Sequence, residues 1–204
     1  MLRTFRLLLH TRRTKALVAS LESQAEIMTH LLNIGPGHTD KKTERIVKKD
    51  SEFSRLIKMN LFLIFFLRDL QFALNDTLSE RNRSKQDFYA RHLAIIVTDF
   101  FDKYGPMLNM GVRQEIRNSQ NANLSAALNE TEVAFKKLKK VDDAYLRDIR
   151  NAVAAHRDID PIVQIVQFEK LNADRVCKAG HDVSAICSNL MVFWTVLIKS
   201  ELTK

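Results

Sequence analysis

The chain has 204 residues and a formal charge of +8, because 32 lysines and arginines outnumber 24 aspartates and glutamates. Its five glycines and three prolines are too few for the closely spaced turns of a sheet protein. Its two cysteines exclude a disulfide framework and zinc sites built on pairs of thiolates, and they fit a cytoplasmic protein.

Apolar residues recur three or four positions apart through most of the chain, which is the spacing of the buried face of an α-helix. The pattern predicts helices at 4–32, 53–78, 85–104, 124–157, 162–178 and 183–201. Breaks are predicted where glycine, proline or a polar stretch interrupts the periodicity: Gly35-Pro36, 75–84, Gly105-Pro106, Asp160-Pro161 and Gly180. Strand-like alternation is missing, so we expect an all-α, single-domain bundle of five to six helices.

Three local features refine this expectation. Ser84 precedes Asp87 by three residues, a spacing that predicts a helix start with the Ser84 hydroxyl as its cap. The predicted helix 124–157 is expected to bend near Val141. A short turn is expected within 112–118.

Residues 1–80 are expected to form an N-terminal helical extension packed on the bundle, and residues 85–204 to form the main helical domain. The most apolar run, 61–67, is much shorter than the roughly 20 residues that cross a bilayer, so no membrane span is predicted. The basic residues within 1–15 leave open a peripheral contact with a membrane through an amphipathic opening helix.

The end of the fourth predicted helix carries an ionisable residue on its apolar face. At about 100° per residue, this face collects Tyr145, Ile149, Ala152, Val153 and His156. His156 has two interpretations. It is either a core residue whose ring nitrogens find hydrogen-bond partners inside the protein, or a functional residue that faces a cleft. Arg150 and Arg157 lie on the margin of the same face, whereas Arg147 and Asn151 point more toward solvent.

Arg150 and His156 cannot meet on one continuous helix, because they are about 120° apart around the axis and about 9 Å apart along it. Either the helix ends between them, or a second copy of the helix supplies the missing partner. A two-fold dimer through this helix would provide the second copy, because such an interface presents the same patch twice.

The string Arg150-Asn151-x-x-x-x-His156 resembles the signature of the HEPN superfamily (higher eukaryote and prokaryote nucleotide-binding domains). That signature is an Arg, usually followed by a polar residue, and then a His after four to six intervening residues. Five residues intervene here, and Asn151 is the polar one. The resemblance covers mainly residues 85–202. The family consists of small all-α domains, which fits the helical pattern of this chain.

The resemblance implies a metal-independent endoribonuclease that works as a homodimer, with the two motifs facing one cleft. His156 would act as general base or acid, Arg150 would stabilise the phosphorane, and Asn151 would orient the phosphate or the imidazole. The expected products are a 2′,3′-cyclic phosphate and a 5′-hydroxyl, without any cofactor. Some toxin members carry a Tyr two residues after the His, and Asp158 stands there in this chain.

Basic side chains around the motif are candidate RNA contacts: Lys136, Lys137, Lys139, Lys140, Arg147 and Arg157. A solvated face is the alternative, because aspartates are interspersed among them. Few exposed aromatic side chains are expected for base stacking. Asp102, near the end of its predicted helix, could support the site from a neighbouring helix. His92 and Asp99 lie almost two turns apart, so we predict no metal site.

The resemblance thus implies a ribonuclease that acts as a toxin or antiphage effector, whose partners are RNA, a second copy of the chain, and an antitoxin or other regulatory protein. Cysteine usage places it in the cytoplasm. The alternative is a catalytically silent helical module of the same kind that binds a nucleotide or a protein partner.

Overall fold

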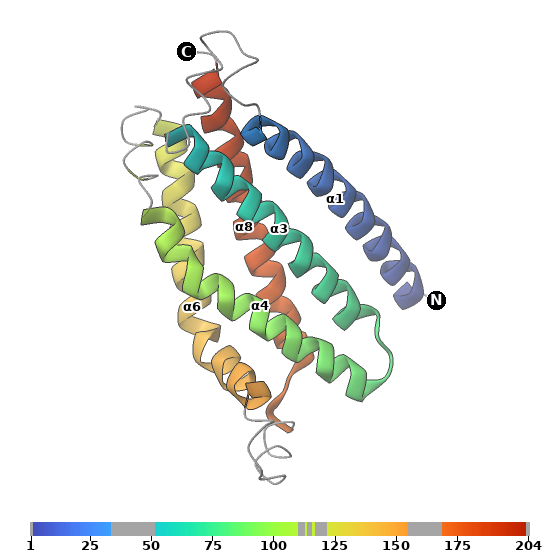
Figure 1. The fold of residues 1–204 in the computed structure, drawn as a ribbon. Helices are drawn as coiled ribbons and strands as arrows, with labels where there is room; N and C mark the ends of the chain where they lie inside the picture. The colour runs from blue at the N-terminus through green and yellow to red at the C-terminus, as the bar shows by residue number, and fades with distance from the viewer. Residues whose placement is uncertain are drawn as a thin grey trace.

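The computed structural model describes residues 2–33, 52–109, 113, 116, 122–154 and 169–202. They form five helices, α1 (Leu2–Asn33), α3 (Glu52–Ser79), α4 (Arg83–Asn109), α6 (Ala122–Ala154) and α8 (Ala173–Leu202). Figure 1 shows α3, α4, α6 and α8 gathered into a bundle, with α1 lying along α3. No strand occurs in the described ranges, so the predicted all-α helical bundle is confirmed.

Helix α3 connects the two parts into which the sequence was divided. It packs against α1 on one side and against both α4 and α8 on the other. Its buried leucines therefore belong to the same core as those of α4 and α8. The division into 1–80 and 85–204 stays a prediction, but the contact between the two parts is made by a helix that is central to the bundle.

The predicted helix end at Gly105-Pro106 is wrong, because α4 continues through both residues to Asn109. Beyond the proline, Met107 and Leu108 are buried in the core. The free energy gained by burying them offsets the loss of the backbone hydrogen bond that a proline removes from a helix. Gly105 also helps, because the proline ring normally clashes with the Cβ of the preceding residue, and glycine has none.

The predicted break at Gly180 is also wrong, because α8 runs without interruption from Ala173 to Leu202. Gly180 is buried, and a Cβ added there would lie 2.9 Å from a methyl carbon of Leu74 and 3.2 Å from one of Leu93. The glycine therefore serves close packing of α8 on α3 and α4 and not the end of a helix.

Asparagine side chains mark two helix starts that the sequence placed elsewhere. The Asn82 side chain accepts a hydrogen bond from the Lys85 amide at 3.1 Å, so Asn82 caps α4 and Ser84 lies inside the helix. Asn172 accepts one from the Arg175 amide at 3.0 Å. Residues 171 and 172 are not helical, so the predicted helix 162–178 is not continuous. Residues 162–168 and most of 112–118 lie outside the described residues.

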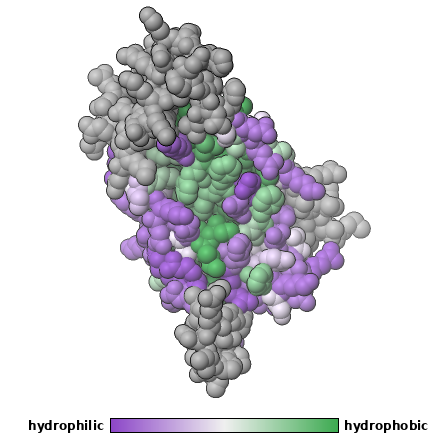
Figure 2. All heavy atoms as spheres, viewed as in Figure 1, coloured by the Kyte–Doolittle hydropathy of each residue, from purple (hydrophilic) through white to green (hydrophobic). Residues whose placement is uncertain are grey.

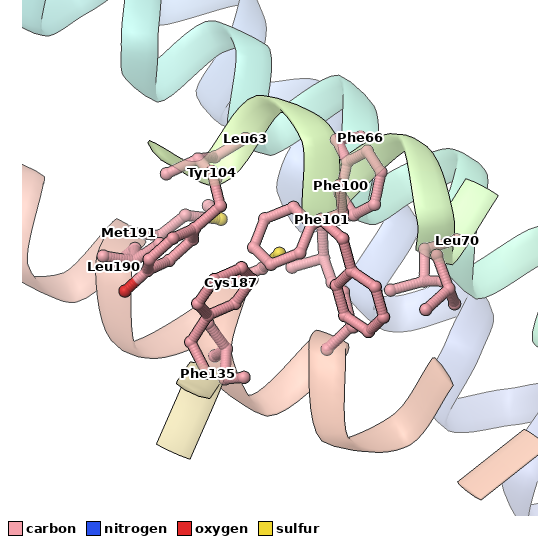
Figure 3. Packing of buried hydrophobic residues seen from close by; sticks show 14 of the residues in the cluster. Leu63, Phe66, Leu70, Phe100, Phe101, Tyr104, Phe135, Cys187, Leu190 and Met191 are labelled. Atoms are coloured by element: carbon pink, nitrogen blue, oxygen red, sulfur yellow. The ribbon is translucent and has the colours of Figure 1, made fainter. Parts of the chain in front are cut away.

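The core is organised around aromatic rings from three helices (Figure 3). Phe135 of α6 stacks on Tyr104 of α4, with ring centroids 3.7 Å apart, and meets Phe100 and Phe101 edge-on. Phe66 of α3 stacks on Phe100 with centroids 5.0 Å apart. Offset and edge-to-face contacts of this kind add to the stabilisation from burial. The aromatic cluster therefore fixes how α3, α4 and α6 sit relative to one another.

Both cysteines, Cys177 and Cys187, are free and buried. Burial raises the pKa of Cys177 to about 11. The thiols are consequently protonated at neutral pH and poorly reactive.

Tyr145 holds the start of α8 against α6. Its hydroxyl oxygen accepts a hydrogen bond from the Asn172 backbone N–H at 2.8 Å. The Arg175 guanidinium lies 4.0 Å from the centre of the Tyr145 ring, and its Nε donates to Asp142 at 2.9 Å. The half-buried tyrosine and Arg175 together fix the first turn of α8 beside α6.

The Tyr145→Phe variant is expected to lower the free energy of unfolding by about 1 kcal/mol, because the Asn172 amide loses its acceptor. Urea unfolding followed by circular dichroism measures the change. Tyr89→Phe is the matched control, since the Tyr89 ring is also half-buried and no hydrogen bond of its hydroxyl is found among the described residues. Equal losses from the two variants would show that the hydroxyl of Tyr145 contributes nothing specific.

Candidate functional site

Two arginines of α6 converge on one carboxylate of α4. Arg150 donates from Nη1 to Oδ2 of Asp102 at 3.3 Å. Arg147, one turn earlier, donates to both oxygens of the same carboxylate. Residues three apart on a helix share a face, so the spacing of the two arginines brings both to the α4 side. The predicted supporting residue, Asp102, therefore meets the predicted catalytic residue Arg150 within one chain.

The two arginines are engaged to different degrees. Arg147 uses all three guanidinium nitrogens, because its Nε also donates to Asp143 at 2.7 Å. Arg150 uses Nη1 alone, and its Nε and Nη2 have no partner among the described residues. A guanidinium offers five N–H donors in a planar fork that matches phosphate oxygens. Arg147 thus positions the carboxylate, while Arg150 keeps most of its donors open.

The electrostatics of the cluster favour an ionised Asp102. The hydrogen bond from Arg147 is the main cause that holds the pKa of Asp102 below its ordinary value of 3.8. The same bond raises the pKa of Arg147. Because the folded-state pKa of Asp102 is lowered, its contribution to stability is present above about pH 4 and is lost as the pH falls further. With Asp143, which pairs with Arg147, the cluster holds two arginines and two aspartates, so its formal charges balance.

The rest of the predicted motif is described only in part. Asn151 is exposed, as its place on the helix predicted, and Ile149 is buried. Arg147 is half-buried and paired with aspartates, where the sequence placed it nearer to solvent. His156 and Arg157 lie outside the described residues, so their roles and the composite cleft between two copies stay predictions.

The four predicted lysine contacts point to different sides of α6. Lys136 and Lys140 are exposed and lie eleven and seven residues before Arg147, which places them in one row with Arg147 and Arg150. Lys137 instead lines a groove between α6 and α8. Lys139 is half-buried on the other side of the row. Helical spacing thus groups Lys136, Lys140, Arg147 and Arg150 into a basic row along α6, and the groove beside α8 sets Lys137 apart from that row.

Exposed aromatic side chains are more prominent than the sequence suggested. Phe65 and Phe72 of α3 and Phe88 of α4 are exposed, although phenylalanine spacing indicated core positions. Figure 2 shows apolar side chains over the front of the bundle, bordered by hydrophilic ones. The Arg68 guanidinium lies 5.3 Å from the centre of the Phe65 ring. The reason for the error is that helical periodicity identifies an apolar face but not whether a neighbouring helix covers it.

The described residues hold neither a cluster of metal-ligating side chains nor a membrane-spanning helix. Nowhere among these residues do three or more His, Cys, Asp or Glu side chains gather as metal ligands would. None of the described helices combines the length and the apolar character needed to cross a membrane.

Fold and site together define an all-α helical bundle with a basic row of side chains along one of its helices. No protein-family model, curated protein or solved structure matches this chain.

Proposed function

We propose that this protein is a metal-independent endoribonuclease of the HEPN type that acts as a toxin or antiphage effector. The observation that carries the proposal is the state of Arg150, whose guanidinium is oriented through Nη1 by Asp102, while its Nε and Nη2 meet no partner among the residues that the structure describes. An arginine held in this way is prepared to receive a phosphate group, because its position is fixed before the ligand arrives.

RNA supplies its own nucleophile, so the protein needs only to transfer protons and to stabilise the charge on the phosphate. The 2′-hydroxyl attacks the adjacent phosphorus, the 5′-oxygen leaves, and a 2′,3′-cyclic phosphate forms. His156 would take the proton from the 2′-hydroxyl or give one to the leaving oxygen, since an imidazole exchanges protons near neutral pH. Arg150 would stabilise the charge that gathers on the phosphate oxygens, and Asn151 would orient the phosphate or the imidazole.

The test is cleavage of a labelled RNA by the purified chain in the presence of EDTA. We expect fragments that end in a 2′,3′-cyclic phosphate and begin with a 5′-hydroxyl, and no cleavage by the His156→Ala variant. RNA left intact by the wild-type chain, both with EDTA and with added divalent cations, would contradict the proposal. Cleavage that persists in the His156→Ala variant would point to a contaminating nuclease.

The second candidate function is a silent module that binds a nucleotide or a protein partner. It is favoured by the carboxylate of Asp102, which already occupies part of the Arg150 guanidinium and would compete with an incoming phosphate. A chain that binds a nucleotide through Arg150 but leaves RNA intact would support this alternative.

The basic row is expected to contact the phosphate backbone of bound RNA. In a His156→Ala background, replacing Lys136 and Lys140 with alanine should lower the slope of log affinity against log salt by about 1.4, or 0.7 for each lost contact with a single strand. Fluorescence anisotropy at several salt concentrations measures this slope.

The matched control replaces Lys15 and Lys58, two exposed lysines of α1 and α3, with alanine. It removes the same net charge from other surfaces and should leave the slope nearly unchanged. If both pairs lower the slope equally, binding responds to net charge alone and the basic row is not a binding surface.

A further inference from the structure

The outer faces of α6 and α8 expose an unusual number of valines. Val133 and Val141 of α6 and Val192 and Val196 of α8 are between 41% and 67% exposed. Between the two helices runs a groove of about 370 Å³, lined on the α6 side by residues that include Ala134 and Val141. Aliphatic side chains on neighbouring helices, beside a groove, are typical of a surface that another protein covers.

The order of residues along α6 indicates which protein that is. By helical spacing, the outer face of α6 carries Ala126, Glu130, Val133, Ala134, Lys137 and Val141, and all six are exposed. An antiparallel second α6 can be placed on this face with a two-fold axis between positions 133 and 134. Glu130 of each copy then lies opposite Lys137 of the other, and Ala126 lies opposite Val141.

We propose that this face binds a second copy of the same chain, so that the protein is a dimer through the outer faces of α6 and α8. A two-fold interface must be complementary to itself, and the order of charges along this face meets that requirement. Neither Glu130 nor Lys137 is ion-paired with another described residue, so each side chain is available to the other copy. Alanine opposite valine lets the two helices approach closely, and the valines lose contact with water.

This interface lies away from the proposed nuclease site. Arg150 lies about 25 Å along α6 from the two-fold axis, so the two Arg150 side chains would be about 50 Å apart. Each active site would then work with Asp102 of its own chain. A composite cleft, as the HEPN resemblance implies, would need the second copy at the Arg150 end of α6 instead.

Charge exchange across the axis tests the proposal. Sedimentation equilibrium is expected to show a dimer for the wild-type chain. The E130K and K137E variants should each weaken the dimer about a hundredfold, because each places like charges face to face twice. The double variant E130K/K137E should restore the dimer, since it exchanges the two charges and recreates both pairs. D99K, at a surface position of α4, is the control and should leave the dimer intact.

Chemical cross-linking supplies a readout that does not depend on affinity. The buried native cysteines should not react, so Ala134→Cys treated with a short bismaleimide should give a covalent dimer in the folded protein. A chain that is monomeric at micromolar concentration would overturn the proposal. A failure of the double charge exchange to restore the dimer would do the same. A cross-link through Asn151→Cys in place of Ala134→Cys would place the second copy at the Arg150 end and also overturn it.

Discussion

Replacing Arg150 with alanine is expected to slow RNA cleavage by roughly 100- to 1000-fold, the effect of removing one donor to an oxygen that gains charge in a transition state. The stability of the fold should change little, because the ion pair with Asp102 is partly exposed and such pairs contribute at most about 1 kcal/mol. Single-turnover cleavage of a labelled RNA and thermal unfolding measure the two quantities.

The chain offers a closely matched control for this variant. Arg68 also donates to an aspartate, Asp69, at 3.0 Å, and its side chain is 33% exposed against 32% for Arg150. Arg68→Ala removes the same charge and a similar ion pair from α3 and should leave the cleavage rate unchanged. If the two variants lose the same activity, Arg150 has no special part in the reaction.

Arg147 is expected to behave differently from Arg150, because its guanidinium is bound by Asp102 and Asp143. The Arg147→Ala variant should slow cleavage less than Arg150→Ala does, since it only releases the carboxylate that orients Arg150.

Replacing Gly180 with valine is expected to lower the free energy of unfolding by about 2 kcal/mol. The new side chain would press on Leu74 and Leu93, which are fully buried, and overpacking a filled core costs about 1–3 kcal/mol. Valine is a better helix former than glycine, so helix propensity alone predicts a small gain in stability instead. The sign of the change therefore separates close packing from a helix break. Urea unfolding measures it.

Ala16→Val provides the control for this variant. Ala16 is exposed on α1, so valine there should cost only its lower helix propensity, roughly 0.5 kcal/mol. A Gly180→Val variant that is as stable as the wild type would show that α8 does not need glycine to approach α3 and α4.

The helices themselves could be predicted because their cause is local. Apolar spacing of three or four residues located α1, α3 and α6 to within a few residues at every end that the structure describes. The continuity of α4 through Gly105-Pro106 and of α8 through Gly180 could not be predicted, because glycine and proline act differently in a helix that is exposed and in one that is packed. The burial of Leu108 and the close approach of Leu74 to Gly180 both depend on how the helices pack.

The candidate site shows the same division. Residue types and spacing drew attention to Arg150, and the position of Asp102 near the end of its helix suggested a support. Only the packing of α6 on α4 brought the two together. The sequence treated four lysines as one cluster, whereas the faces of α6 assign two of them to the basic row and one to the groove beside α8.

The amino-acid sequence by itself determined that this chain is helical, where most of its helices lie, and which residues are capable of phosphate chemistry, since all three follow from local periodicity and residue type. The tertiary structure alone decided that Asp102 meets Arg147 and Arg150, that Lys137 borders the groove beside α8, and which valines of α6 and α8 remain exposed, because each of these depends on which helices lie next to each other.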